Sequence, residues 1–448
     1  MRDGTPKQVL SLTDCVAMTV GLVIGAGIFR LPSVVAGALP DERLILLVWV
    51  LGGIVSFIGA LCYAELATAF PSAGGEYHFL TRAYGPSVGF MFAWARMTVI
   101  QGGSLAVFAY VFGDYATQLL PLGPFSSAIY AAVILAALTA LNLAGIRHTK
   151  NFQNTLFAAT ILGLAVLIVA AVFAPAPADA AAVGEAVPSS FSAQGFGTGM
   201  LLVLLTFGGW NEAAYISAEV QDRRRNMVRV LIISIAVITV LYVAVNLAYL
   251  NVLGVAGVAA SQAVAADVMS TVFGAPGAVI MTVIVLIIVL DNTNITLFTG
   301  ARSNFALGRD FHLFRFLRRW DEARGVPTSG VLLQSALALA IVALGAVARQ
   351  GLQTVIDYLQ PVFWLFFLLT GLSLFVLRWR EPDVERPFRV PLYPVTPALF
   401  CLTGAYMLYS SVMFTGRGAL VGIAVLALGF PVLALARRSP VRTSDAPR

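Results

Sequence analysis

Two glycine-containing interruptions lie within long apolar stretches of this 448-residue chain. They are Val23, Ile24, Gly25, Ala26 and Gly27, and then Leu205, Thr206, Phe207, Gly208 and Gly209, followed by Trp210 and Asn211. Glycine tolerates backbone angles that end a helix, so each stretch could unwind and leave peptide N–H and C=O groups free. N–H groups that open the next half-helix suit a carboxylate, and carbonyls that close the previous one suit an ammonium. The pattern therefore predicts a site for a small zwitterion such as an α-amino acid.

Close helix packing is the alternative explanation for the glycines, because small residues let two membrane helices approach each other. That explanation suffices for the first stretch taken alone. Two breaks in corresponding positions of two halves are instead typical of transport proteins whose substrate lies between discontinuous helices. We therefore expect both breaks to form one binding site.

The composition indicates the class of protein in which these breaks lie. The chain is 59% hydrophobic and 11% charged, with a mean hydropathy of +0.87, values that exclude a soluble domain of this size. Apolar runs long enough to cross a bilayer predict an all-α membrane protein with about 12 transmembrane helices. We place them near 12–36, 44–69, 88–119, 126–145, 153–174, 197–219, 228–253, 273–301, 330–348, 355–377, 395–414 and 418–436.

Several chemistries are excluded by the same survey. Both lysines, Lys7 and Lys150, lie outside the predicted spans, and no phosphate-binding loop is present. The three histidines fall in connections, and no histidine and cysteine cluster has the spacing of a metal site. We expect no cofactor, no metal and no enzyme activity, so a gradient must supply the energy.

Positive charge is distributed unevenly between the two sides. Arginine and lysine gather in the connections at 82–96, 147–150, 223–229, 302–324 and 378–389, whereas the opposite side holds only Arg30, Arg43, Arg349 and Arg417. The positive-inside rule then places both termini in the cytoplasm, and we expect the membrane to be the plasma (cell inner) membrane. This asymmetry accounts for the net charge of +6, so no nucleic-acid partner is needed.

The breaks also suggest how the chain is divided. We expect residues 1–174 to form a first repeat of five spans and residues 197–378 a second, joined by an external loop at 175–196. Because five is odd, the repeats would have inverted topology, and each would open with its broken helix. Residues 379–436 would add two helices, and residues 437–448 would form a cytoplasmic tail.

An ordered set of motifs resembles the amino acid-polyamine-organocation superfamily, with the L-type amino acid transporters as the nearest branch. The motifs are Gly25-Ala-Gly-Ile-Phe29, Tyr63-Ala-Glu-Leu66, Phe70-Pro-Ser-Ala-Gly-Gly-Glu-Tyr77, Gly208-Gly-Trp-Asn211, Thr299-Gly-Ala-Arg302 and Arg386-Pro-Phe-Arg-Val-Pro-Leu-Tyr-Pro394. The resemblance implies a 5+5 inverted-repeat (LeuT-like) core with discontinuous helices 1 and 6, and alternating access around a central amino acid site. It also implies that the substrate carboxylate meets the N–H groups of Ala26 and Gly27. The ammonium would meet carbonyls near Val23 and Ile24 and near Leu205, Thr206 and Gly208, with Asn211 as a polar bridge.

Departures from the family pattern concern single positions. Ala26 stands where relatives often carry serine, and Leu205 stands where this branch carries an aromatic lid, whose role Phe207 or Trp210 could take. Thr160 replaces a lysine that in many bacterial relatives fills the place of a sodium ion. No cysteine follows span three between Pro121 and Phe125, so we expect no disulfide-linked accessory subunit.

Ionisable residues at membrane depth are candidates for gating or coupling. They are Asp291, Glu212 and Glu65, and the uncharged residues Asn294, Trp210 and Thr160 are further candidates for the same roles. A carboxyl in mid-span is costly and therefore a functional candidate, although the amides beside Asp291 could satisfy it structurally. Asn211 could cap the half-helix that follows the second break, with Glu212 stabilised there by the helix dipole, or Glu212 could contact a basic side chain. We expect Glu65 and Glu219 to form gate or anchoring ion pairs near Arg82 and the Arg223 cluster.

The predicted function is secondary transport of L-amino acids, with neutral ones favoured, as a permease or exchanger. A cationic amino acid or polyamine antiporter, with protons as one coupling ion and Asp291 or Glu212 as the ligand, is the alternative. The coupling ion, proton or sodium, stays open. An ion or solute channel is the remote alternative, since channels require a continuous polar lining.

Overall fold

The computed structural model describes residues 8–25, 27–174, 188, 190–261, 263–348, 351–415 and 417–437. Regular structure in these residues is helical, apart from two isolated bridges, Leu10 to Val220 and Asp321 to Val326. Ala26, most of the loop predicted at 175–196, and residues 438–448 of the predicted tail lie outside the described residues. The all-α prediction is confirmed.

The first part of the chain contains α1 (Leu12–Val23), α2 (Gly27–Ala38), α3 (Glu42–Ala69), α4 (Glu76–Tyr84), α5 (Pro86–Ala95), the π-helix η1 (Arg96–Gln101), α6 (Gly102–Leu119), α7 (Ser126–Ala144) and α8 (Ile146–Val172). The second part contains α9 (Ala193–Thr206), η3 (Trp210–Glu212), α10 (Ala213–Ile216), α11 (Arg223–Ala260), α12 (Val264–Phe273), α13 (Ala275–Asp310), η4 (His312–Arg318), α14 (Thr328–Ala348) and α15 (Gly351–Arg380). The last helices are α16 (Val395–Thr415), α17 (Arg417–Ala427) and α18 (Gly429–Arg437).

Nine helices of the described residues are long and apolar enough to cross a membrane, and the pair α1 and α2, bent by 47°, makes a tenth span if it is counted as one. The expected number of twelve is reached only if α9 with α10, and α17 with α18, each form one interrupted span. Both interruptions predicted from the glycines are therefore present, one between α1 and α2 and one after α9.

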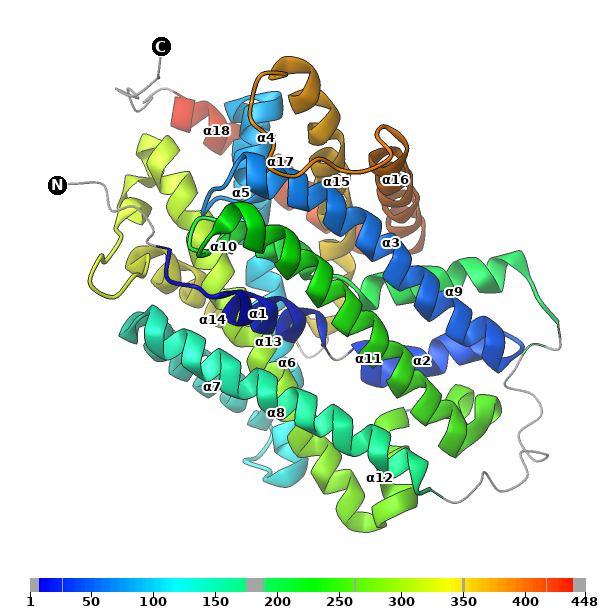
Figure 1. Ribbon diagram of the computed structural model, residues 1–448. Coiled ribbons are helices and arrows are strands. Elements are labelled where there is room, and N and C mark those ends of the chain that lie inside the picture. Colours follow the sequence, from blue (N-terminus) through cyan, green and yellow to red (C-terminus); the bar gives the residue numbers. More distant parts are fainter. Residues whose placement is uncertain are drawn as a thin grey trace.

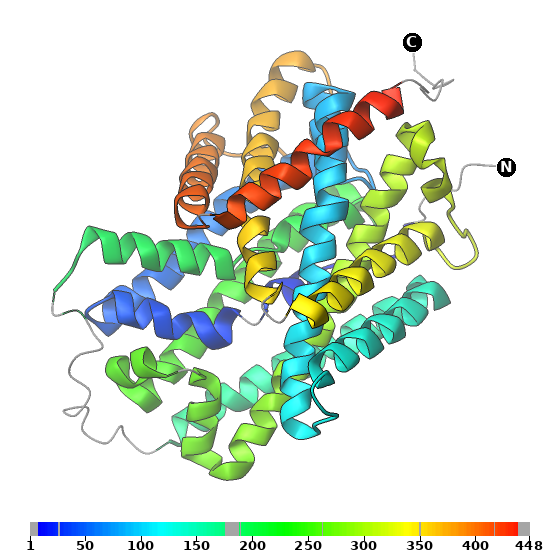
Figure 2. The same ribbon diagram turned by 180° about the vertical axis from the view of Figure 1, so that it is seen from behind.

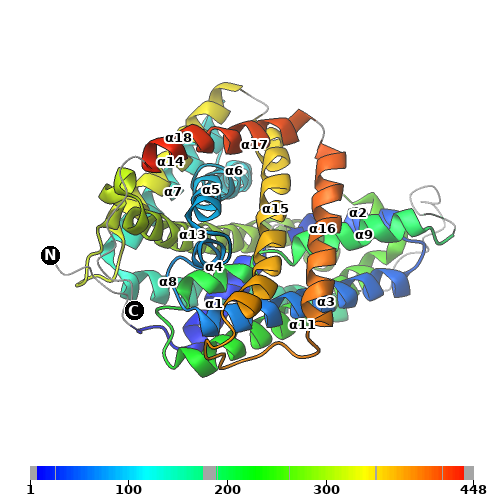
Figure 3. The same cartoon turned by 90° about the horizontal axis from the view of Figure 1, so that it is seen from above.

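Long tilted helices form the body of the molecule (Figure 1). The helices α3 and α11 run side by side, and Gly53 permits this, because a Cβ at that position would come within 2.5 Å of the Thr239 side chain. Behind them, α17 and α18 pass beside α5 and α15 (Figure 2). Seen from above, α15 and α16 lie next to each other (Figure 3).

Two arginines that the charge survey assigned to cytoplasmic connections are buried inside helices. Arg96 and Arg302 are each only 1% exposed, and Arg302 lies within α13, which extends nine residues beyond the span predicted to end at 301. The assignment was wrong because each guanidinium has a glutamate partner within the protein, so the helix does not need to end before the charge.

Glu65 on α3 holds the segment that follows α15. Its carboxylate accepts hydrogen bonds from Arg378 at 2.8 and 2.6 Å and from the Val390 N–H at 2.7 Å, and Arg386 lies 3.4 Å away. Arg82, the partner expected from sequence, pairs with Glu381 instead. Glu65 therefore forms an anchoring ion pair, as expected in kind, with different arginines.

We predict that Glu65→Gln destabilises the protein by about 3 kcal/mol, because it leaves buried guanidinium groups without a charged partner. The melting temperature of the purified protein in detergent should fall by several degrees. Glu385→Gln is the matched control, since Glu385 pairs with Arg224 at the surface with side-chain exposures of 69% and 64%. Equal melting temperatures for the two variants would contradict the anchoring role.

Candidate ligand site between two broken helices

The two breaks lie against each other although about 180 residues separate them. A Cβ on Gly27 would come within 3.2 Å of the Thr206 side chain, and one on Gly209 within 3.4 Å of Leu22. Gly209 has a φ of 115°, a conformation that side chains rarely adopt. The sequence therefore places glycine where the chain must turn and where the two breaks touch.

Side chains of other helices satisfy the carbonyls that the first break frees. The amide nitrogen of Asn292 on α13 donates to the carbonyls of Gly21 and Ile24, each at 3.0 Å. The hydroxyl of Tyr242 on α11 lies 2.7 Å from the Val23 carbonyl and 3.2 Å from that of Thr206. Tyr242 thus joins the end of α1 to the end of α9.

These hydrogen bonds involve the same carbonyls that we expected to bind the substrate ammonium. Val23, Ile24 and Thr206 each already accept one hydrogen bond from a side chain, and the Leu205 carbonyl accepts from the Gly208 N–H at 3.2 Å. A carbonyl has two lone pairs, so an ammonium would have to share them or displace these donors. Sequence reasoning singled out neither Tyr242 nor the capping role of Asn292, because neither lies near a break in the chain.

The N–H groups needed for a carboxylate lie at the start of α2. This helix begins at Gly27, and its first-turn N–H groups have no carbonyl partner within the helix. The positive end of the helix dipole therefore points into the break, beside Thr206. Gly25 faces the Asn292 side chain on the other side of the break.

Aromatic side chains enclose the second break. Phe207 is fully buried against Trp49 and Tyr242, and Trp210 packs on Tyr63 and Phe367. A cavity of about 30 Å³ adjoins Gly208, Gly209, Trp210 and Asn211, which is room for a water molecule and not for an amino acid. Leu205 lines a separate cavity of about 400 Å³ between α9 and α16.

A buried ion pair lies directly after the second break. Arg96 binds both oxygens of Glu212, at 2.9 and 2.6 Å, and the two side chains are only 2% and 12% exposed. Gln101 donates to the same carboxylate at 3.3 Å. Of the two roles considered for Glu212, contact with a basic side chain is the one that the geometry shows.

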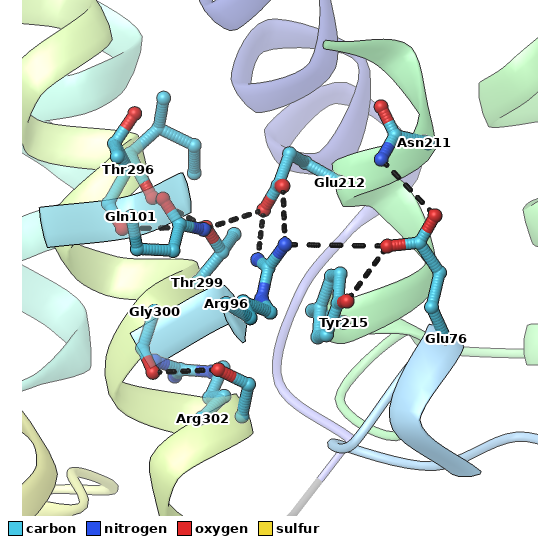
Figure 4. Close-up of polar contacts among 12 residues, drawn as sticks. Glu76, Arg96, Gln101, Asn211, Glu212, Tyr215, Thr296, Thr299, Gly300 and Arg302 are labelled. Carbon is cyan, nitrogen blue, oxygen red and sulfur yellow. Dashed lines mark hydrogen bonds and ion pairs between the residues drawn. The ribbon is translucent and has the colours of Figure 1, made fainter. Parts of the chain in front are cut away.

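Glu76 on α4 completes this cluster and was not singled out from the sequence, although it belongs to the Gly-Gly-Glu-Tyr motif. Figure 4 shows Arg96 between the carboxylates of Glu212 and Glu76, the latter 4.0 Å away. Tyr215 donates to Glu76 at 2.8 Å and Asn211 at 3.3 Å. The pKa of Glu76 is raised from its ordinary value because burial of the carboxyl outweighs these favourable contacts.

Backbone irregularity marks the helix that carries Arg96. Residues Arg96–Gln101 form a π-helical turn between α5 and α6, a distortion that often occurs at functional sites. The Arg96 Nε atom is buried and has no hydrogen-bond partner among the described residues. The turn directs both Arg96 and Gln101 to Glu212.

A second buried pair, Glu219 with Arg302, lies beyond α10. Arg302 donates to both carboxylate oxygens, once at 2.9 Å, and its guanidinium lies 3.3 Å from the centre of the Phe298 ring. Leu10 pairs with the Glu219 backbone at 2.9 Å, so the segment before α1 is held here too. The Arg223 cluster expected to pair with Glu219 does not do so.

The remaining coupling candidates lie where α13 meets α8. Asp291 and Asn294 are fully buried, and both hydrogen-bond to Gln153 of α8. Thr160 is also buried on α8, with a hydroxyl that has no partner among the described residues. In the part of the chain that the structure describes, no group of histidine, cysteine and carboxylate side chains could hold a metal.

Comparison with known proteins identifies the family. The family model described as amino acid permease matches residues 10–429. The large neutral amino acids transporter small subunit 2 of Mus musculus is 30% identical over 443 residues, which cover 95% of this chain and 80% of that protein. The Asc-type amino acid transporter 1 of Mus musculus is 30% identical, covering 96% and 81%. The b(0,+)-type amino acid transporter 1 of Homo sapiens is 28% identical over 416 residues, covering 91% and 83%.

These matches extend over most of the chain and include both breaks and the helices around them. The motifs that resemble the superfamily all lie within the residues that the family model matches. The chain therefore belongs to the amino acid permease family, within the amino acid-polyamine-organocation superfamily, and is a multi-pass secondary amino acid transporter rather than an enzyme.

Proposed function

We propose that this transporter carries neutral L-amino acids across the plasma membrane by alternating access around the two breaks. The observation that supports neutral substrates is the bidentate ion pair between Arg96 and Glu212. Glu212 is the carboxylate nearest the second break in the chain, and its charge is neutralised by a guanidinium held in place. A lysine or arginine side chain would have to compete with Arg96 for it.

In this proposal the substrate carboxylate binds the N–H groups of Ala26 and Gly27 at the start of α2. The ammonium binds near Ile24 and Gly208, where it shares carbonyls with Asn292 and Tyr242 or replaces their donated hydrogen bonds. The small cavity beside Trp210 supports a closed state, because binding a side chain there needs the break to widen. Phe207 or Trp210 would then serve as the aromatic lid, because Leu205 is not aromatic.

The topology belongs to the same proposal. Two inverted repeats, 1–174 and 197–378, would each open with a broken helix, and 379–436 would add two helices outside that core. Both termini would lie in the cytoplasm, an assignment that rests on the remaining arginine-rich connections now that Arg96 and Arg302 are buried.

The names of the relatives bear on whether this chain binds an accessory subunit through a disulfide. One relative is itself named a small subunit, which stands against our expectation that this chain has no disulfide-linked partner. The cysteines Cys15, Cys62 and Cys401 are free and buried. We propose that any partner of this chain binds without a disulfide, because no thiol is accessible at its surface.

We predict that Gly27→Leu abolishes transport, because its side chain would enter the space occupied by Thr206 and block the start of α2. The measurement is counterflow of labelled L-leucine into proteoliposomes loaded with a panel of neutral amino acids, cationic amino acids and polyamines. Gly257→Leu is the control, since only Leu253 of its own helix lies nearby. Wild-type counterflow of labelled L-arginine or putrescine, with none of labelled L-leucine, would replace the neutral assignment with the cationic one.

We predict that Arg96→Gln increases competition by lysine for L-leucine counterflow roughly tenfold, which corresponds to about 1.4 kcal/mol, because Glu212 becomes available to a cationic side chain. The double variant Arg96→Gln with Glu212→Gln should lose that gain, since the charge itself is gone. Unchanged lysine competition in a folded single variant that still exchanges leucine would show that Glu212 does not face the substrate.

A further inference from the structure

A chain of side-chain amides ends at Asp291 in the middle of α13. Asn142 of α7 donates to Asn294 at 3.0 Å, Asn294 donates to Gln153 of α8 at 2.7 Å, and Gln153 donates to one oxygen of Asp291. Every amide in the chain points its N–H toward Asp291. The carboxyl is therefore the terminal acceptor of a network that links three helices.

The second oxygen of Asp291 has no partner. Its Oδ2 is buried without a hydrogen bond among the described residues, and it lies against the backbone of Gly21, where an added Cβ would be within 2.3 Å. An ionised carboxylate here would keep one oxygen without a donor, in an environment that excludes water. The geometry calls for a small positive ligand at Oδ2.

Charged neighbours do not supply that ligand. Asp291 has no ion pair in the described residues. Titratable groups on the helices packed against α13 are Asp14 and Cys15 on α1, Arg147, His148 and Lys150 on α8, Tyr110, Asp114 and Tyr115 on α6, Tyr130 on α7, Asp267 on α12, Arg96 on η1, Tyr215 on α10, and His312, Arg315 and Arg318 on η4. Of the arginine and lysine on α8, Arg147 is exposed and Lys150 is paired with Asp14 at 3.0 Å.

A metal cation fits this position poorly. Hard cations need several oxygen ligands, whereas the group facing Asp291 from α8 is the Gln153 N–H. The nearby carbonyls of Gly21 and Ile24 accept from the Asn292 amide. A proton needs only the free oxygen of Asp291 and no further space.

We propose that Asp291 is a proton-binding site that couples transport to a proton gradient. This inference rests on the proposed function, because it adds a driving ion to the same substrate site. With the proton on Oδ2, the carboxyl is neutral and α1 packs directly on it through Gly21. Loss of the proton to water requires that water reach Oδ2, which requires α1 to move away from α13.

Proton binding and substrate binding are coupled because both depend on the position of α1. Gly21 lies on α1, the half-helix that ends at the first break, so a displacement that hydrates Asp291 also changes the carbonyls of Val23 and Ile24. Proton release and substrate release then favour the same conformation. A bound proton favours the packed arrangement described here.

The test uses the full-length protein in proteoliposomes, with labelled L-leucine as the probe. Vesicles without internal amino acid receive an inward pH gradient, an inward sodium gradient or none, and an internal pH dye records proton entry. We expect the pH gradient alone to accumulate leucine at least tenfold in wild type, with proton entry on adding leucine. Asp291→Asn should keep leucine-leucine exchange and lose both responses.

Control variants distinguish the effect of losing the Asp291 carboxyl from the effect of disturbing its surroundings. Asp114→Asn removes an exposed carboxylate that bonds only Ser127 and should behave as wild type. Asp291→Ser removes the carboxyl without adding an unpaired amide, and replaces Asp291→Asn if that variant does not fold. The infrared spectrum of the wild-type protein should contain the band of a protonated carboxylic acid. That band should be absent from the spectrum of the Asp291 variant.

Three results would overturn the proposal. They are pH-driven accumulation that survives in a folded Asp291 variant, accumulation that follows sodium alone, and wild-type exchange without any response to pH. Each of these leaves the proposed function intact, because exchange persists. Absence of counterflow with every amino acid in folded wild type would instead overturn the proposed function, and this inference with it.

Discussion

Peptide groups in a hydrocarbon layer need hydrogen-bond partners, and the rest of this structure depends on how that constraint is met at two broken helices. Asn292 satisfies the Gly21 and Ile24 carbonyls, and Tyr242 reaches Val23 and Thr206 together. Both donors come from long helices, α13 and α11. The breaks are therefore stable only because these two helices lie beside them, which ties the site to the packing of the whole bundle.

Buried charge follows the same logic. Burying Arg96 or Arg302 without a partner would be costly, and each is bound by both oxygens of one glutamate. One pair lies directly after the second break and the other lies beyond the short helix α10. The segment between them, which carries Tyr215, is thus held at one end to η1 and at the other to α13. A motion that opens the site has to carry these pairs along or separate them.

The structure shows the surroundings of Thr160 and Leu205, two positions that depart from the family pattern. Thr160, at the position where the resemblance predicts a lysine in span five, is buried on α8, and among the described residues Asp291 has no ion pair. In the same way Leu205 faces the cavity between α9 and α16, and aromatic enclosure of the second break falls to Phe207 and Trp210.

Local properties of the chain determined much of this protein. Apolar length predicted the membrane helices, and the glycines at 25–27 and 208–209 predicted both breaks, because hydrophobicity and backbone freedom are properties of residues near each other in sequence. Partners of charged groups could not be predicted in this way. Arg96 was assigned to a connection, and Glu76 and Gln153 were not singled out, since a buried charge or amide is tolerated only through a residue far along the chain. Tertiary structure alone decided that Glu212 binds Arg96, that Glu65 binds Arg378, and that Tyr242 joins the two breaks, because each contact requires helices distant in sequence to meet.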